Sequence, residues 1–151
     1  MDKQEKRISR CLCLQILYAN NTSGSEFEDV FDNFFEENNK DFEYTLSKEQ
    51  IAYASNLFQL TLKHDVKIDK MIESKLVNWE IKRLARMDKM ILRMAIAEMI
   101  YMDSVPPKVS ISEGVEIAKE YSTVDSSSFV NGILDAIYNN VYIKDNHKKV
   151  K

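Results

Sequence analysis

Residues that break helices are scarce in this chain of 151 residues, which has three glycines and two prolines. So few breakers exclude a collagen-like or low-complexity chain, and they argue against a β-sandwich with many turns. Charged residues make up 30% of the chain and hydrophobic residues 44%, which is the balance of a folded globular protein. At this length we expect one domain with enough chain to bury a sizeable core.

Cysteines and long hydrophobic runs are also scarce. Cys11 and Cys13 lie two positions apart, so on a helix they are about 200° apart around the axis, which predicts neither a disulfide nor a zinc site. The most apolar segment, residues 90–102, is interrupted by two charged residues and is too short to span a membrane. Residues 2–10 are too polar for a signal peptide. We therefore expect a cytoplasmic protein.

Hydrophobic residues recur at helical spacing along most of the chain, which predicts an all-α fold of about seven helices. The expected helices cover approximately residues 3–19, 25–37, 47–64, 67–77, 82–102, 108–121 and 126–141. The third begins with Ser47 and Gln50 at the spacing of a capping box. We expect a single domain over residues 1–141 and a basic, disordered tail over residues 142–151.

Residue groups that would carry catalysis are not found in the sequence. His64 lies near a helix end and His147 in the tail, and there is no Gly-rich phosphate loop or metalloprotease motif. Glu98 lies in an apolar helix, where we expect it to pair with a buried base or to cap a neighbouring helix rather than to catalyse. We expect no enzymatic activity, no metal and no cofactor.

Four basic residues near the amino terminus share one helix face: Lys3, Lys6, Arg7 and Arg10. They fall within an arc of about 100°, and the segment after them, residues 11–18, is nearly all apolar. We expect the apolar half of this helix to be buried and the basic half to face solvent, where it would suit a nucleic-acid backbone. An ordinary solvated helix face is the alternative.

A second basic stripe consists of Lys82, Arg86, Lys89 and Arg93, which share one narrow face if that helix is continuous. It either pairs with the acidic segment over residues 26–37 or binds a partner. The net charge of −3 hides a segregation, because residues 26–49 hold nine acidic and two basic residues while the remainder carries a net charge of +4. Such segregation suits an adaptor that holds RNA on one side and a protein on another.

Several sequence blocks occur in an order that is specific to one family. They are Arg10–Tyr18, Asn78–Leu84, Met87–Ala95, Val105–Val109, Glu113–Lys119 and Ser128–Asp135. This arrangement, which spans about residues 7–138, resembles the NusB family of bacterial transcription antitermination factors. The resemblance implies an all-α fold of two small helical bundles without catalysis.

The resemblance also implies a role. NusB proteins bind boxA-type single-stranded RNA together with NusE, a ribosomal protein of the small subunit, and help RNA polymerase to resist termination, notably in ribosomal RNA operons. The RNA-binding basic stretch of the family maps onto Lys3, Lys6, Arg7 and Arg10. Whether the chain is a monomer or a homodimer stays open.

Three further positions match functional positions of the family. Phe129 matches an aromatic residue beside the RNA path, where it either stacks on a base or belongs to the core. Asp88 and Asp125 match acidic positions on the NusE and RNA side, where the resemblance assigns them to the NusE partner, although Asp125 is also placed to N-cap the last helix.

The chain departs from the I-N-E-A block of the family at Ser112 and Gly114. Gly114 is expected to weaken its helix by up to about 1 kcal/mol relative to alanine.

Two other functions stay open. One is a helical module related to the amino-terminal domain of ribosomal RNA cytosine methyltransferases, although these 151 residues contain no α/β cofactor domain. The other is an adaptor that binds only proteins.

Overall fold

The computed structural model describes residues 1–20, 46–77 and 80–144. Within these ranges it contains six α-helices, a 3₁₀ turn and a π-helical segment without a strand, which confirms the all-α prediction. The chain divides into two compact units, Met1–Gln59 and Leu60–Lys151. The predicted helix over residues 25–37, the loop after it, the corner at residues 78–79 and the tail beyond residue 144 lie outside the described residues.

The first unit begins with helix α1 (Lys3–Ala19), which has the bounds predicted from the sequence. Asp2 caps it, because the Asp2 carboxylate accepts from the Glu5 backbone N–H at 2.8 Å and the Glu5 carboxylate accepts from the Asp2 N–H at 3.1 Å. The apolar second half of α1 is buried, as predicted, and includes Leu12 and Ile16. Local capping and an apolar face therefore account for this helix.

Helix α4 (Lys48–Lys63) begins at the predicted capping box. The Gln50 N–H donates to Ser47 Oγ at 3.1 Å, and the Ser47 N–H donates to Gln50 Oε1 at 2.9 Å. The side-chain amide of Gln50 also donates to the backbone carbonyl of Glu5 at 3.2 Å. The same glutamine thus starts α4 and ties it to the first turns of α1.

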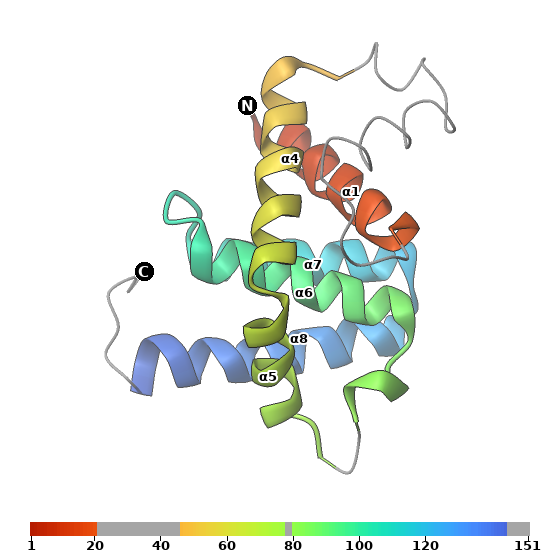
Figure 1. Ribbon diagram of the computed structural model, residues 1–151, viewed down its shortest axis with the longest axis vertical. Helices are drawn as coiled ribbons and strands as arrows, with labels where there is room; N and C mark the ends of the chain where they lie inside the picture. Colours follow the sequence, from red (N-terminus) through yellow and green to blue (C-terminus); the bar gives the residue numbers. More distant parts are fainter. Residues whose placement is uncertain (21–45, 78–79, 145–151) are drawn as a thin grey trace. The chain divides into compact units, whose positions relative to one another are not determined.

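The second unit contains α5 (Asp65–Ser74), α6 (Arg86–Tyr101), α7 (Pro107–Tyr121) and α8 (Val124–Tyr138). Helix α7 runs antiparallel to α6 and α8 and packs against both, while α5 crosses them (Figure 1). A methyl group at Gly114 of α7 would lie 3.1 Å from Leu134 Cδ1 and 3.3 Å from Ala95 Cβ. Close packing of the three helices therefore leaves little room for a side chain at Gly114.

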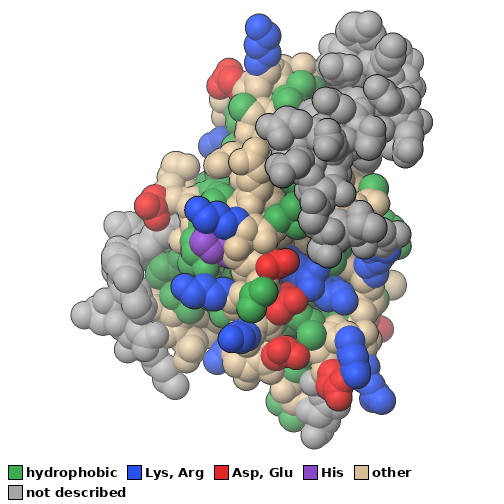
Figure 2. Space-filling view, in the orientation of Figure 1, with side chains coloured by type: hydrophobic (Ala, Val, Ile, Leu, Met, Phe, Trp, Pro, Cys, Tyr) green, Lys and Arg blue, Asp and Glu red, His purple; other side chains and the backbone are tan. Residues whose placement is uncertain are grey.

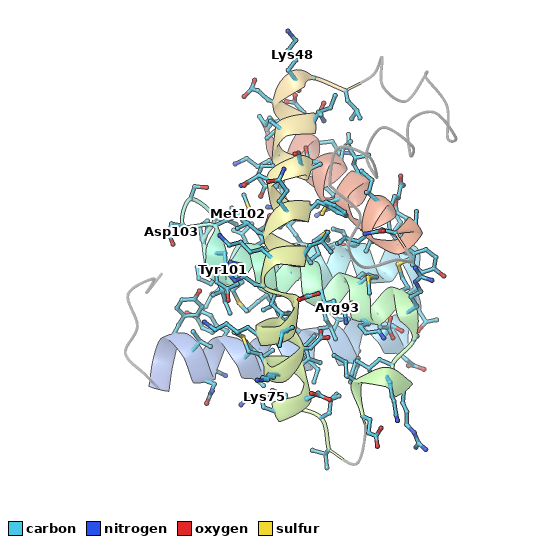
Figure 3. The ribbon with its side chains drawn as sticks, viewed as in Figure 1. Lys48, Lys75, Arg93, Tyr101, Met102 and Asp103 are labelled. Atoms are coloured by element: carbon cyan, nitrogen blue, oxygen red, sulfur yellow. The ribbon has the colours of Figure 1, made fainter. Side chains whose placement is uncertain are left out.

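The predicted helix over residues 82–102 is wrong at its amino end. Residues Ile81–Arg83 form a 3₁₀ turn, Leu84 and Ala85 are extended, and α6 begins at Arg86. Lys82 therefore lies outside α6, and the predicted four-residue basic stripe is broken. Its last member, Arg93, pairs with Asp69 of α5 through two bonds of 2.7 and 2.6 Å (Figure 3 labels Arg93).

Two boundaries near the carboxyl terminus also differ from the prediction. Helix α8 begins two residues early, and its N-cap is Thr123, whose hydroxyl accepts from the Ser126 N–H at 3.0 Å, rather than Asp125. After α8 a π-helical segment (Asn139–Lys144) continues the chain. Tyr142 in this segment is buried and donates to the Met99 carbonyl at 2.7 Å, so the predicted boundary at residue 141 is too early.

Candidate RNA and protein interface

The first turns of α1 present the basic arm, which we define as Lys3, Lys6 and Arg7. Lys3 and Lys6 are exposed and Arg7 is half-buried. The capping box of Asp2 and Glu5 fixes the helical conformation of this segment from its first residue. The arm is therefore a short cationic face on an ordered helix, a form that suits contacts with phosphates.

Arg10 does not belong to the exposed face, which corrects the prediction. It is 3% exposed, its guanidinium donates to the Tyr53 hydroxyl at 3.3 Å, and the guanidinium carbon lies 5.7 Å from the centre of that ring. Helical spacing places Arg10 on the same face as Lys3 and Lys6, but the face is covered by α4 at this point. Arg10 thus anchors α4 to α1 in the first unit.

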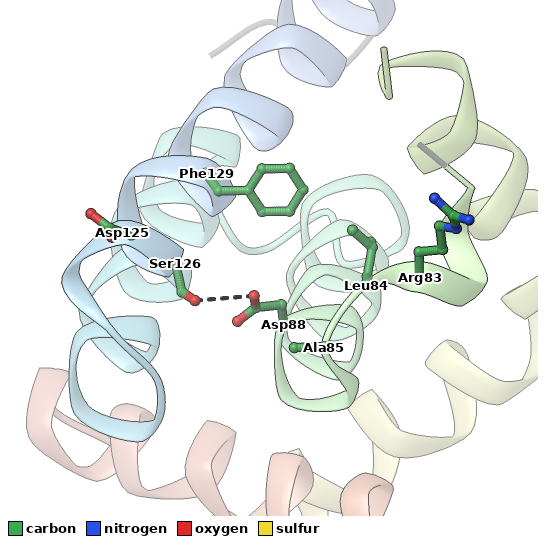
Figure 4. Close-up of a pocket in the computed structure, with 7 residues that line it drawn as sticks. All are labelled: Arg83, Leu84, Ala85, Asp88, Asp125, Ser126 and Phe129. Atoms are coloured by element: carbon green, nitrogen blue, oxygen red, sulfur yellow. Dashed lines mark hydrogen bonds between the residues drawn. The ribbon is translucent and has the colours of Figure 1, made fainter. Parts of the chain in front are cut away.

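The second unit carries a pocket of about 410 Å³ at the amino ends of α6 and α8. It is lined by residues from three segments of the chain: Arg83, Leu84, Ala85, Asp88, Asp125, Ser126 and Phe129. The half-buried ring of Phe129 projects from α8 toward Leu84, with Arg83 beyond it (Figure 4). The lining therefore combines an aromatic ring, a cation and two acids, which is a composition suited to a polar planar group.

Asp88 is the buried acid of this pocket, with 8% of its surface exposed. One carboxylate oxygen accepts from the Ser122 hydroxyl at 2.9 Å, and the other accepts from the Ser126 hydroxyl at 3.0 Å (Figure 4). The two oxygens of this α6 residue are thus bonded to Ser122, which follows α7, and to Ser126 in the first turn of α8. The arrangement fixes the start of α8, which carries Asp125 and Phe129, relative to α6.

The two acids that sequence reasoning grouped together differ in the structure. Asp125 is exposed in the first turn of α8, where a negative charge is favoured by the helix dipole. Its carboxylate is directed away from Leu84 and Arg83 (Figure 4). Asp125 is therefore available to a partner, whereas Asp88 is committed to bonds within its own unit.

Sequence reasoning missed Arg83, Leu84 and Ala85 as part of the pocket. The assumption of one helix over residues 82–102 placed them inside a regular element. Asp88 could have indicated the true start of α6. An acidic residue is favoured in the first turn of a helix, so its position predicts that a helix begins just before it. The break at Leu84 and Ala85 brings their side chains to the pocket.

Within residues 1–20, 46–77 and 80–144, no three His, Cys, Asp or Glu side chains form a group that could hold a metal ion. Glu98 is buried and accepts from the Ser110 hydroxyl at 2.9 Å, so it bonds to the neighbouring helix α7. No helix in these ranges is long and apolar enough to cross a membrane.

Comparison with known proteins places the chain in a family. The model of the NusB family matches residues 7–139. The chain belongs to the NusB family. It is 31% identical to the transcription antitermination protein NusB of Syntrophus aciditrophicus (strain SB) over 147 residues. The aligned region covers 97% of this chain and 88% of that relative.

Two further NusB matches differ in how much they cover. The protein from Chloroherpeton thalassium (strain ATCC 35110 / GB-78) is 61% identical over 77 residues, 51% of this chain and only 36% of the relative's length. A crystal structure of the antitermination factors NusB and NusE in complex with dsRNA has a chain with a TM-score of 0.76 and 28% identity. That match covers 92% of this NusB-family chain and 99% of the other.

Proposed function

We propose that this NusB-family chain is a transcription antitermination factor that binds boxA-type single-stranded RNA together with NusE. In this role it helps RNA polymerase to resist termination, notably in ribosomal RNA operons, and acts in the cytoplasm without catalysing a reaction. The observation that carries the proposal is the likeness over most of the chain to NusB proteins, one of them in a complex with NusE and RNA.

The basic arm and the pocket supply different parts of the proposed binding. Lys3, Lys6 and Arg7 would contact phosphates, which adds affinity without reading the sequence. Phe129 would stack on a base at the pocket, since a partly exposed aromatic ring is the usual platform for an unpaired base. Arg10 is buried and would support the arm through Tyr53 rather than touch RNA.

The two acids at the amino ends of α6 and α8 would serve the protein partner. Exposed Asp125 is the residue that we assign to direct contact with NusE. Asp88 would act indirectly, by holding Ser122 and Ser126 and therefore the surface that carries Asp125. This division follows from burial, because a carboxylate with both oxygens bonded has little left to offer a partner.

A gel-shift experiment with boxA-like RNA, with and without NusE, tests the proposal. We expect the tightest complex when the chain and NusE are both present, and no such complex with an RNA of scrambled sequence. If the chain binds NusE but never adds to RNA binding, the role is that of an adaptor that binds only proteins. If it binds neither, the proposed function is wrong.

The salt dependence of the same complex tests the basic arm. For Lys3→Gln/Lys6→Gln we expect the slope of log affinity against log salt to flatten by about 1.4, because each lysine that neutralises a phosphate of a single strand adds about 0.7 to the slope. The matched control is Lys48→Gln/Lys119→Gln, which removes two exposed lysines elsewhere. Equal slopes for the two variants would remove the arm from the RNA interface.

A further inference from the structure

A second set of exposed lysines lies where α4 passes into α5. We call Lys63, Lys67 and Lys70 the α5 stripe; all three are exposed. Helical hydrogen bonds cross the junction between the helices, from the His64 N–H to the Leu60 carbonyl at 3.1 Å and from the Ile68 N–H to the His64 carbonyl at 2.9 Å. On such a turn the three lysines fall within an arc of about 60°.

The opposite side of α5 is buried through Ile68 and Ile72, so the α5 stripe is the outward face of this helix. Asp69, the acid between Lys67 and Lys70, is held by the bidentate pair with Arg93. Within the part of the chain that the structure describes, the three lysines make no ion pair.

An aromatic pair lies beside the α5 stripe. The rings of His64 and Tyr101 are stacked with centroids 3.7 Å apart and an angle of 8° between their planes. Lys63 directly precedes His64 in the chain and Lys67 follows it by three residues. Desolvation lowers the pKa of His64, and the positive charges of Lys63 and Lys67 lower it further. Figure 2 shows a histidine with Lys or Arg side chains on two sides of it.

We propose that the α5 stripe, with the rim of the His64–Tyr101 pair, binds the backbone of RNA that continues past the element held at the pocket. This inference rests on the proposed function. Tyr101 ends α6 (Figure 3) and Asp88 lies in its first turn, thirteen residues earlier, so the two sites are about 20 Å apart along the helix.

The chemistry of the α5 stripe favours RNA over an acidic protein. Cations that flank half-exposed aromatic rings form the platform that single-stranded nucleic acids use, with phosphates on the charges and bases or riboses against the rings. Lysine is a point charge without the fork of arginine, so these contacts are not specific for sequence. The α5 stripe therefore adds affinity for longer RNA and leaves the choice of element to the pocket.

The test compares a short boxA-like RNA with the same RNA extended at both ends, by about ten nucleotides each to cross the roughly 20 Å between the sites. The protein is the full chain with NusE, as wild type, as Lys63→Gln/Lys67→Gln and as the charge-matched control Lys48→Gln/Lys119→Gln. For the first variant we expect the salt slope on extended RNA to flatten by about 1.4, with binding of the short RNA unchanged. Equal thermal midpoints would show that both variants are folded.

Four results would overturn the inference. The first is that the α5 stripe variant binds extended RNA like the control variant. The second is that the extension adds nothing to the affinity of the wild type, in which case the α5 stripe fails while the proposed function stands. The third is that the wild type binds neither RNA, in which case the proposed function fails and the α5 stripe with it. The fourth is that the substitutions weaken NusE binding in the absence of RNA, because the α5 stripe would then be a protein surface.

Discussion

The amino-terminal turns of α1 and α8 are both capped, but they are supported in different ways. The first turn of α1 is capped by bonds between Asp2 and Glu5, and its bond to another helix goes to the backbone, from the Gln50 side-chain amide to the Glu5 carbonyl. The first turn of α8 has its own cap at Thr123 and is also bonded through Ser126 to Asp88 of another helix. A cationic arm that only presents charge needs local order, whereas a pocket needs side chains from three segments held at fixed distances.

The largest effect is expected from removal of Asp88, which supports the start of α8. For Asp88→Ala we expect the free energy of unfolding to fall by about 2–3 kcal/mol, because two half-buried hydroxyl groups lose a charged acceptor. Urea denaturation measures this, and NusE binding should weaken in parallel. Asp88→Asn should lose less, since the amide can accept from one hydroxyl and donate to the other.

The control for this comparison is Asp135→Ala, an exposed acid on α8 for which we expect a change within about 0.5 kcal/mol. Equal losses for the Asp88→Ala and Asp135→Ala variants would mean that the bonds to Ser122 and Ser126 contribute nothing. The start of α8 would then be held without any contribution from the carboxylate of Asp88.

The second effect concerns Phe129 at the pocket. For Phe129→Ala we expect the affinity for boxA-like RNA to fall by about 5- to 150-fold, the equivalent of about 1–3 kcal/mol of base stacking. Fluorescence anisotropy of labelled RNA measures the loss. Val124→Ala is the control, because Val124 is 76% exposed in the first turn of the same helix and does not line the pocket. An unchanged affinity with lowered stability would make Phe129 a packing residue only.

The third effect compares the two caps directly. Asp2→Ala and Thr123→Ala each remove a cap that contributes about 1 kcal/mol. We expect amide hydrogen exchange to accelerate throughout the first turn of α1 in the first variant. The acceleration should be smaller in the first turn of α8 in the second variant, because Asp88 still holds Ser126. Similar acceleration in both helices would contradict the difference that we draw between them.

The smallest effect comes from two glycines and compares a packed helix face with an open one. Around Gly132 of α8 an added methyl group would meet no atom within 4 Å, so Gly132→Ala should raise the free energy of unfolding by about 0.5–1 kcal/mol. Gly114→Ala should lower it, since the methyl group would crowd Leu134 and Ala95. Thermal denaturation of both variants measures the sign, and a gain at Gly114 would show that α6, α7 and α8 can move apart without cost.

Helix positions followed from the sequence wherever local chemistry decides them. The bounds of α1 were predicted from a run without glycine or proline that ends at a polar, glycine-containing stretch, and the start of α4 from the spacing of Ser47 and Gln50. The break before α6 was missed because Leu84 and Ala85 both favour helices and neither glycine nor proline marks the point. Here tertiary contacts override propensity, and the same break forms part of the pocket lining.

The sequence by itself determined the all-α class, the basic arm and the family, since capping, periodicity and block order are local properties of the chain. Only the tertiary structure decided that Arg10 is buried against Tyr53, that Asp88 bonds to Ser122 and Ser126 at the start of α8 and that His64 stacks on Tyr101 beside the α5 stripe. Periodicity shows which residues share a helix face, but not what covers that face. Burial and bonding are set by segments distant in sequence, and for this reason these roles could not be predicted from spacing alone.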